Sequence, residues 1–191
     1  MKEEFLKNIP DKRIDKNTTS LKFKEDVIDF FYPMKLQNCI EIGTSNGYST
    51  RILSFIFENV TTVDIDINNI QIAKSNNIDR SNIEYLHGDS VNNEWLDDIK
   101  FNMAFIDADH RYQAVINDIH KAIKCGVKGL YLVFDDYGLP ETVPAVKAAV
   151  DEMINKGILE LIQYIGEPAG SEPRIGRTLI DWEGVICKSL I

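Results

Sequence analysis

Short apolar segments alternate with amphipathic ones from about residue 36 to the end of the sequence, and this alternation limits the possible folds more than any other feature. The segments at 101–106 and 129–134 are almost continuously apolar, as is typical of strands buried on both faces of a parallel sheet. Between them, residues 111–124 place apolar side chains at helical spacing, with polar residues opposite. Repeated strand–helix units predict a doubly wound α/β fold, with helices on both faces of a mostly parallel sheet.

The same patterns give approximate boundaries for the elements. We expect strands near 37–42, 60–65, 82–86, 101–106, 129–134, 158–164 and 177–186, and helices near 21–32, 47–57, 67–76, 111–124 and 141–156. The last two strands have no convincing helix between them and 166–176 resembles a long loop, so an antiparallel hairpin should end the sheet. We expect a single domain over 1–191, with a helical extension at 1–35, a core at 36–137, and a final helix and hairpin at 138–191. The helix at 21–32 could act as a lid or as a contact in a homo-oligomer.

The composition of the chain limits the kinds of partner and the cellular compartment that we expect. A formal net charge of −9 leaves no electrostatic footprint for nucleic acid or an anionic membrane, which favours a small-molecule partner. Cys39, Cys125 and Cys187 are widely separated and odd in number, which indicates free thiols in a reducing compartment. No apolar run approaches the ~20 residues needed to cross a bilayer, and the N-terminus does not resemble a secretory signal. The expected location is the cytoplasm.

In doubly wound sheets, ligands bind beyond the carboxyl ends of the strands, so the residues after each strand matter most. After the first strand, "EIGTSNGYST" places Gly43 and Gly47 at a strand-to-helix turn, where the backbone can approach a ligand and the helix offers free N–H donors. Asp64 ends the second strand, roughly 20 residues further on, where a carboxylate can accept hydrogen bonds from both ribose hydroxyls of a nucleoside. After the third strand, "HGDS" places residues 88–90 where they can contact a purine.

This arrangement favours S-adenosylmethionine over NAD. The dinucleotide fingerprint G-x-G-x-x-G is absent, and Ser45 stands where its middle glycine would fall. Glu41, two residues before the first glycine, would repel a pyrophosphate but suits a ligand with an ammonium and a sulfonium. A tight strand–helix connection without a ligand is the simpler interpretation of the glycine turn taken alone.

Three carboxylates follow the fourth and fifth expected strands. "FIDADHRY" places Asp107 after the fourth strand, and "LVFDDYG" places Asp135 and Asp136 after the fifth. If these strand ends are neighbours, three unneutralised carboxylates would repel one another, and a hard divalent cation would resolve this. Oxygen ligands point to Mg²⁺, Mn²⁺ or Ca²⁺ rather than Zn²⁺. The alternative is that these residues only mark strand ends and helix N-caps, where Asp is common.

"CIEIGTSNGYST", "VTTVDID", "HGDS", "FIDADHRYQAVINDI" and "LVFDDYG", in this order over residues 36–137, resemble the class I S-adenosylmethionine-dependent methyltransferases. The closest resemblance is to the metal-dependent small-molecule O-methyltransferases. It implies a Rossmann-like, seven-stranded sheet whose last strand is antiparallel. It also implies a divalent cation, with Mg²⁺ as first choice, held by Asp107, Asp135 and Asp136, and a base at Asp109 or His110. The implied cofactor contacts come from Glu41, Gly43, Thr44, Gly47, Tyr48, Ser49, Asp64, Ile65, Gly88, Asp89, Ser90 and Asp107.

Two branches of these enzymes come close: the catechol and caffeoyl-CoA type, and the type that methylates sugar hydroxyls of macrolide and aminocoumarin antibiotics. The catechol type usually has Lys at the position of His110 and Asn at that of Asp136. This chain has neither, which favours the sugar type.

The expected reaction is methyl transfer to a hydroxyl of a small molecule, a sugar or a catechol-like diol, by in-line attack with the cation chelating the acceptor. His110, with an unperturbed pKa of about 6.5, could take the proton near neutral pH. Asp109 is either the base itself or the partner that orients His110. An NAD-dependent oxidoreductase on the same fold and a non-catalytic relative are the alternatives.

Overall fold

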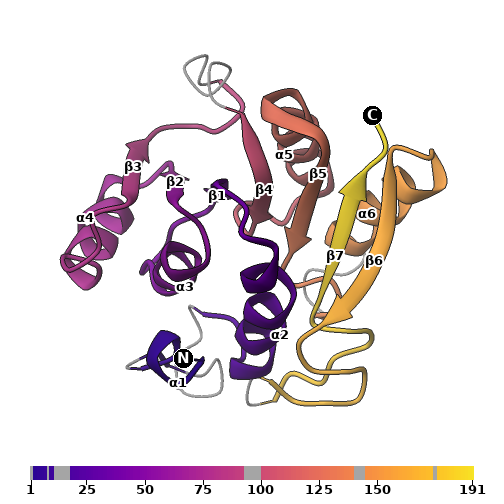
Figure 1. Ribbon diagram of the computed structural model, residues 1–191. Coiled ribbons are helices and arrows are strands. Elements are labelled where there is room, and N and C mark those ends of the chain that lie inside the picture. Colours follow the sequence, from indigo (N-terminus) through magenta and orange to yellow (C-terminus); the bar gives the residue numbers. More distant parts are fainter. Residues whose placement is uncertain (1, 8, 11–17, 93–99, 140–144, 174–175) are drawn as a thin grey trace.

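The computed structural model describes residues 2–7, 9–10, 18–92, 100–139, 145–173 and 176–191. A seven-stranded sheet crosses the molecule in the order β3-β2-β1-β4-β5-β7-β6 (Figure 1). The strands are β1 (Asn38–Ile42), β2 (Asn59–Asp64), β3 (Ile83–His87), β4 (Phe101–Ile106), β5 (Gly126–Phe134), β6 (Leu159–Ile165) and β7 (Gly184–Ser189). Pairing among β1 to β5 is parallel, whereas β7 is antiparallel to both β5 and β6. The predicted doubly wound sheet with an antiparallel last strand is confirmed.

Helices cover both faces of this sheet, with α2 and α3 in front of it in Figure 1 and α5 and α6 behind it. The helices are α1 (Lys2–Phe5), α2 (Leu21–Phe31), the 3₁₀ turn η1 (Tyr32–Met34), α3 (Tyr48–Ile56), α4 (Ile67–Asn76), α5 (Tyr112–Cys125) and α6 (Ala145–Asn155). Alternate side chains of β4 point to opposite faces of the sheet. Met103 and Phe105 pack with residues of α1, α2 and α3, whereas Ala104 and Ile106 pack with residues of α5 and α6. Burial on both faces explains the continuously apolar sequence of this strand.

The start of helix α2 is hydrogen-bonded to the C-terminal hairpin, and a role of this helix as a lid stays a prediction. Its N-cap residue, Ser20, accepts a hydrogen bond from the Phe23 N–H through its hydroxyl oxygen (3.1 Å). The buried carboxylate of Glu183 accepts hydrogen bonds from the Ser20 N–H (2.9 Å), the Ser20 hydroxyl and the Glu167 N–H (3.1 Å). We call this group of contacts the Glu183 anchor. A role of α2 as an oligomer contact stays a prediction.

The predicted final strand at 177–186 is wrong at its start, because β7 begins only at Gly184. Just before it, the backbone makes irregular bonds: the Ile180 N–H donates to the Gly138 carbonyl (3.0 Å) and the Glu183 N–H to the Glu167 carbonyl (2.9 Å). A Cβ at Gly184 would lie 2.3 Å from the Phe23 ring, so glycine at this position lets the start of β7 pack against α2. The first part of the predicted helix at 141–156, residues 141–144, lies outside the described residues.

All three cysteines, Cys39, Cys125 and Cys187, are free and buried. Within the described ranges, no helix is both long and apolar enough to span a membrane.

Candidate functional site

A cavity of about 800 Å³ opens at the edge of the sheet where β1 to β5 end. Its walls come from the turns after these strands, from Thr18 before α2 and from one face of α5. This is where ligands bind in doubly wound sheets, and the volume is ordinary for a small-molecule site. Most of the predicted site residues line this cavity: Gly43, Asp64, Ile65, Gly88, Asp89, Ser90, Asp107, Asp109, His110, Asp135 and Asp136. The other predicted residues do not line it: Glu41, Thr44, Gly47, Tyr48 and Ser49.

The two glycines of the turn after β1 have positive φ angles, +99° at Gly43 and +76° at Gly47. A Cβ at Gly43 would lie 2.1 Å from the backbone oxygen of Asp107, and one at Gly47 would lie 2.7 Å from the Ala73 Cβ. Gly43 therefore lets the turn after β1 pack against the turn after β4, and Gly47 lets α3 begin against α4. Contacts within the protein already require glycine at both positions, in addition to the close ligand approach predicted from the sequence.

Glu41 lies beneath this turn and is fully buried. Its Oε2 accepts hydrogen bonds from the hydroxyls of Thr50 and Thr62, and the Thr62 hydroxyl oxygen lies 2.6 Å from that of Thr44. Loss of solvation raises the pKa of Glu41 to about 8, although the two hydroxyls act to lower it. At neutral pH this carboxyl is mostly protonated, so the repulsion of a pyrophosphate expected from its charge is weak. Its direct contact with the cofactor stays a prediction.

Asp64 ends β2 with its carboxylate in the cavity wall. Its Oδ2 accepts hydrogen bonds from the backbone N–H groups of Thr44 (3.1 Å) and Ser45 (2.9 Å), and its Oδ1 from that of Asp66 (2.8 Å). The side-chain amide of Asn69 donates to the same carboxylate. These bonds fix the carboxylate at the mouth of the glycine turn, the position from which it could bind ribose hydroxyls.

The turn after β3 connects to α5 through Ser90. The Ser90 hydroxyl donates to Asp118 Oδ1 (2.8 Å), while Asp89 accepts from the Val91 N–H (2.9 Å) and from Asn92 (2.6 Å). Asp118 lines the cavity although only 4% of its surface is exposed, and it is one of the buried residues of α5, as Val115 is.

The polar lining residues that the sequence did not assign to the site include Thr18, Ser45, Asn69 and Asp118. A charged residue within the apolar spacing of the helix at 111–124 was the signal that could have identified Asp118.

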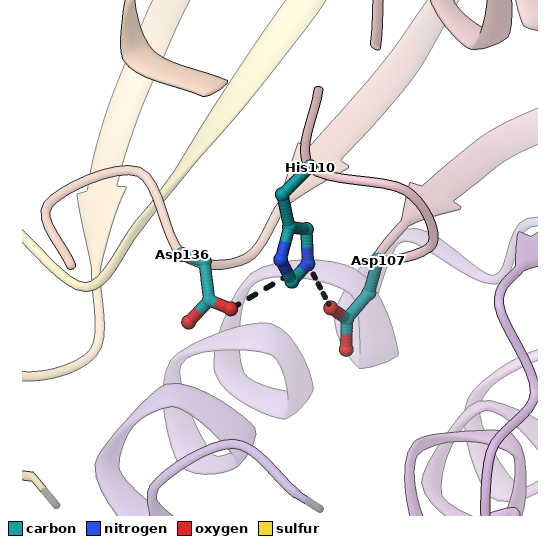
Figure 2. A group of neighbouring side chains, drawn as sticks. All are labelled: Asp107, His110 and Asp136. Atoms are coloured by element: carbon teal, nitrogen blue, oxygen red, sulfur yellow. Dashed lines mark hydrogen bonds and ion pairs between the residues drawn. The ribbon is translucent and has the colours of Figure 1, made fainter. Parts of the chain in front are cut away.

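The turns after β4 and β5 bring Asp107, His110 and Asp136 together (Figure 2). The strand pairing aligns Ile106 with Phe134, so the residues after them are neighbours, as predicted. His110 Nε2 lies 3.5 Å from Asp107 Oδ1 and 3.5 Å from Asp136 Oδ2, and the imidazole stands between the two carboxylates. Asp136 has a left-handed backbone with φ of +57°, a conformation that costs energy in non-glycine residues and is often found at functional sites.

Electrostatics separate the two candidate bases. A hydrogen bond with Asp107 and the charges of Asp136, Asp107 and Asp135 raise the pKa of His110 to about 9, against the effect of burial. Ion pairing with the neighbouring Arg111 guanidinium holds the pKa of Asp109 below its usual range. Asp109 is therefore a weak base that is occupied by its own ion pair, whereas His110 faces the carboxylates.

The donor set of this group fits a divalent cation. Two carboxylates and one imidazole offer ligand atoms that all lie within 4.8 Å of one another. An imidazole nitrogen in the set admits Mn²⁺ and other transition metals besides Mg²⁺, which prefers oxygen. Asp135, predicted as a third ligand, is not part of this group; it is 4% exposed and lies beside Asp136 in the cavity lining. Its role as a ligand stays a prediction.

A family model described as "Methyltransferase domain" matches residues 40–137, a little more than half of the chain. This range runs from β1 to the residue after Asp136, and so includes all five turns of the cavity. An uncharacterized protein of Acanthamoeba polyphaga mimivirus is 33% identical over 131 residues, which are 60% of this chain and 58% of that protein. The chain thus spans less than two thirds of the length of this relative.

Solved structures share the fold over most of the chain. The O-methyltransferase from Bacillus cereus, in complex with SAH, has a TM-score of 0.66 and 20% identity, covering 100% of this chain and 90% of its own. The O-methyltransferase TomG from Streptomyces achromogenes, involved in tomaymycin synthesis and in complex with SAM, has a TM-score of 0.71 and 16% identity, covering 98% and 89%. The N-methyltransferase NodS from Bradyrhizobium japonicum, in complex with S-adenosyl-L-homocysteine, has a TM-score of 0.72 and 14% identity, covering 98% and 96%. At these identities the likeness concerns the fold, which oxygen and nitrogen methyltransferases share.

Proposed function

The chain belongs to the methyltransferase-domain family, and from this premise we propose that it transfers the methyl group of S-adenosylmethionine to a hydroxyl oxygen of a small molecule. The observation that carries this proposal is the group Asp107, His110 and Asp136, which lines the same cavity as the glycine turn and Asp64. One cavity therefore offers a place for a nucleoside cofactor and, beside it, a polar centre that can bind and deprotonate an acceptor.

The order of the strands supports one orientation of the cofactor. The turns that line the cavity follow one another as β3, β2, β1, β4 and β5. With the ribose at Asp64 after β2, the base lies toward residues 88–90 after β3, and the methionine part lies over the glycine turn after β1. The sulfonium methyl then faces the turn after β4, where Asp107 and His110 stand. This arrangement holds methyl donor and acceptor in line, which is a large part of the rate enhancement in two-substrate reactions.

We assign His110 as the base and Asp107 and Asp136 as the groups that orient it. The imidazole nitrogen is 3.5 Å from both carboxylates, and in its neutral form it can take the proton of an acceptor hydroxyl. Asp109, which is bound to Arg111, orients the turn instead.

A divalent cation fits this centre, where Asp107 and Asp136 would hold it and leave the imidazole of His110 to act as the base. Such a cation would supply Lewis-acid stabilisation of the acceptor oxygen as its proton leaves. It would also neutralise the two carboxylates, so that the imidazole need not carry a positive charge.

The acceptor class proposed here is a sugar hydroxyl or a catechol-like diol, with the sugar type preferred because His110 and Asp136 replace the lysine and asparagine usual in the catechol type. A protein of net charge −9 is also poorly suited to nucleic acid acceptors. The proposed location is the cytoplasm, where three free thiols are stable.

Methyl transfer from labelled S-adenosylmethionine to a panel of sugars, glycosides and diols tests the proposal. We expect labelled product with at least one hydroxyl acceptor, and a loss of at least about 100-fold in Asp107→Ala, because the variant removes both a ligand and a partner of His110. The matched control is Asp29→Ala, on the exposed surface of α2, which should keep full activity. Equal activity of Asp107→Ala and the wild type would contradict the assigned site.

A further inference from the structure

We propose that Asp118, together with Ser90, binds the 6-amino group of the cofactor's adenine and selects adenine over other purines. The inference rests on the proposed function, because it requires an adenosyl ligand in the cavity. It assigns a direct ligand contact to a residue of α5, an element that follows β4 and carries none of the cofactor residues expected from the sequence.

Asp118 lines the cavity from α5, near the turn after β3. Ala114, Asn117 and Asp118 of α5 line the cavity, as does Arg111 just before the helix, and a spacing of three to four residues places these positions on one side of α5. Ser90, at the end of the third turn, donates to Asp118 Oδ1 at 2.8 Å. The bond joins the turn after β3 to α5 and places both side chains at the end of the cavity that the strand order assigns to the base.

The hydrogen bond between Ser90 and Asp118 leaves one carboxylate oxygen of Asp118 available to a ligand. An ionised carboxylate only accepts hydrogen bonds, and the Ser90 hydroxyl occupies Oδ1 alone. Within the described part of the chain, no donor contacts Oδ2. The complementary ligand group is therefore a hydrogen-bond donor, and the 6-amino group is the donor on the outer edge of adenine. Hypoxanthine has a carbonyl at that position, whose oxygen would face the carboxylate without a shared proton.

Burial makes the pair selective. Asp118 is 4% exposed, so water can do little to compensate for a mismatched ligand. This desolvation raises the pKa of Asp118 to about 6, with the Ser90 hydroxyl acting in the opposite direction. At neutral pH the carboxylate remains mostly ionised, and a donor from the ligand would stabilise that charge.

Calorimetric titration with S-adenosylhomocysteine and its inosine analogue tests the inference. We expect the wild type to bind the adenine ligand more tightly by about tenfold or more, the range typical of a hydrogen bond to a buried charge. Asp118→Asn keeps the shape of the side chain but presents an amide, and it should reduce this ratio toward one. Ser90→Ala should lower the ratio as well, because Asp118 loses the hydroxyl that orients it.

The matched control is His120→Ala, on the exposed side of the same helix, which should leave both affinities and their ratio unchanged. A purely structural role of Asp118 would weaken both ligands by the same factor and leave the ratio intact, and that result would overturn the inference. Equal binding of both ligands by the wild type would also overturn it. If the wild type binds neither ligand, the proposed function fails together with the inference. If the wild type binds both and the variants keep its ratio of affinities for the two ligands, only the inference fails.

Discussion

His110 carries the charge that balances Asp107 and Asp136, and the proposed chemistry depends on this residue most. Its pKa of about 9 lies above the ordinary 6.5, so the bound proton stabilises the folded protein fully below about pH 6.5. That stabilisation is lost as the pH rises toward 9. A divalent cation between the same carboxylates would replace the proton, so metal binding and deprotonation of His110 are expected to favour each other.

Replacing Asp136 by Asn should lower the pKa of His110, because one of the two neighbouring negative charges is removed. Saturating Mg²⁺ should lower it in the wild type too. The pH dependence of the His110 ring signals by NMR measures both shifts, with the exposed His120 as internal reference. An unchanged His110 titration in Asp136→Asn would show that the two side chains do not interact in solution.

Asp118 should reduce the stability of the ligand-free protein near neutral pH. Its folded pKa of about 6 exceeds the ordinary 3.8, so the folded state loses stability relative to the unfolded chain as the pH rises through this window. Asp118→Asn should therefore raise the free energy of unfolding at pH 7 by up to about 3 kcal/mol and change it little near pH 3.5. Urea unfolding at both pH values measures this difference, and a variant that is less stable at pH 7 would contradict it.

The sequence predicts some of these residues and not others for a definite reason. Asp107, His110 and Asp136 follow apolar strands, so the chain itself marks the edge of the sheet where they lie. Asp118 stands inside a helix, where only the packing of α5 against the turn after β3 shows that it lines the cavity. The protonated state of Glu41 depends on complete burial, which a linear sequence does not reveal.

Among the secondary-structure elements, the helix boundaries follow closely from the local sequence. Helix α4 covers Ile67–Asn76, the predicted range, because Asp66 caps it by accepting from the Asn68 N–H (2.9 Å). The start of β7 was mispredicted because residues 177–183 are held by long-range bonds to residues 138 and 167 rather than by a strand ladder. Long-range contacts of this kind leave no periodic signal.

The Glu183 anchor should contribute strongly to stability, since its carboxylate satisfies three donors, and the two buried ones, from Ser20, join the start of α2 to the hairpin. We expect Glu183→Ala to lower the free energy of unfolding by about 2–4 kcal/mol, because those donors lose their acceptor. The control is Glu160→Ala on the exposed face of β6, expected to change it by less than about 0.5 kcal/mol. Equal denaturation midpoints for the two variants would argue that α2 is held by its apolar contacts alone.

At the scale of the whole molecule, the sheet order determines where the chemistry can occur. The order reverses between β1 and β4, and the paired strands there leave a crevice beyond their carboxyl ends. The alternation of strands and helices was sufficient to predict the doubly wound class. The sequence alone did not establish that β4 and β5 end beside each other. The structure shows it, because Ile106 at the end of β4 pairs with Phe134 at the end of β5.

Calorimetric titration of the purified protein with S-adenosylmethionine is the most direct test of the central claim that this cavity binds a methyl donor. We expect one site per chain, binding weakened at least about tenfold by Asp64→Ala through loss of the ribose contacts, and no binding of NAD. Binding of NAD in place of S-adenosylmethionine would contradict it.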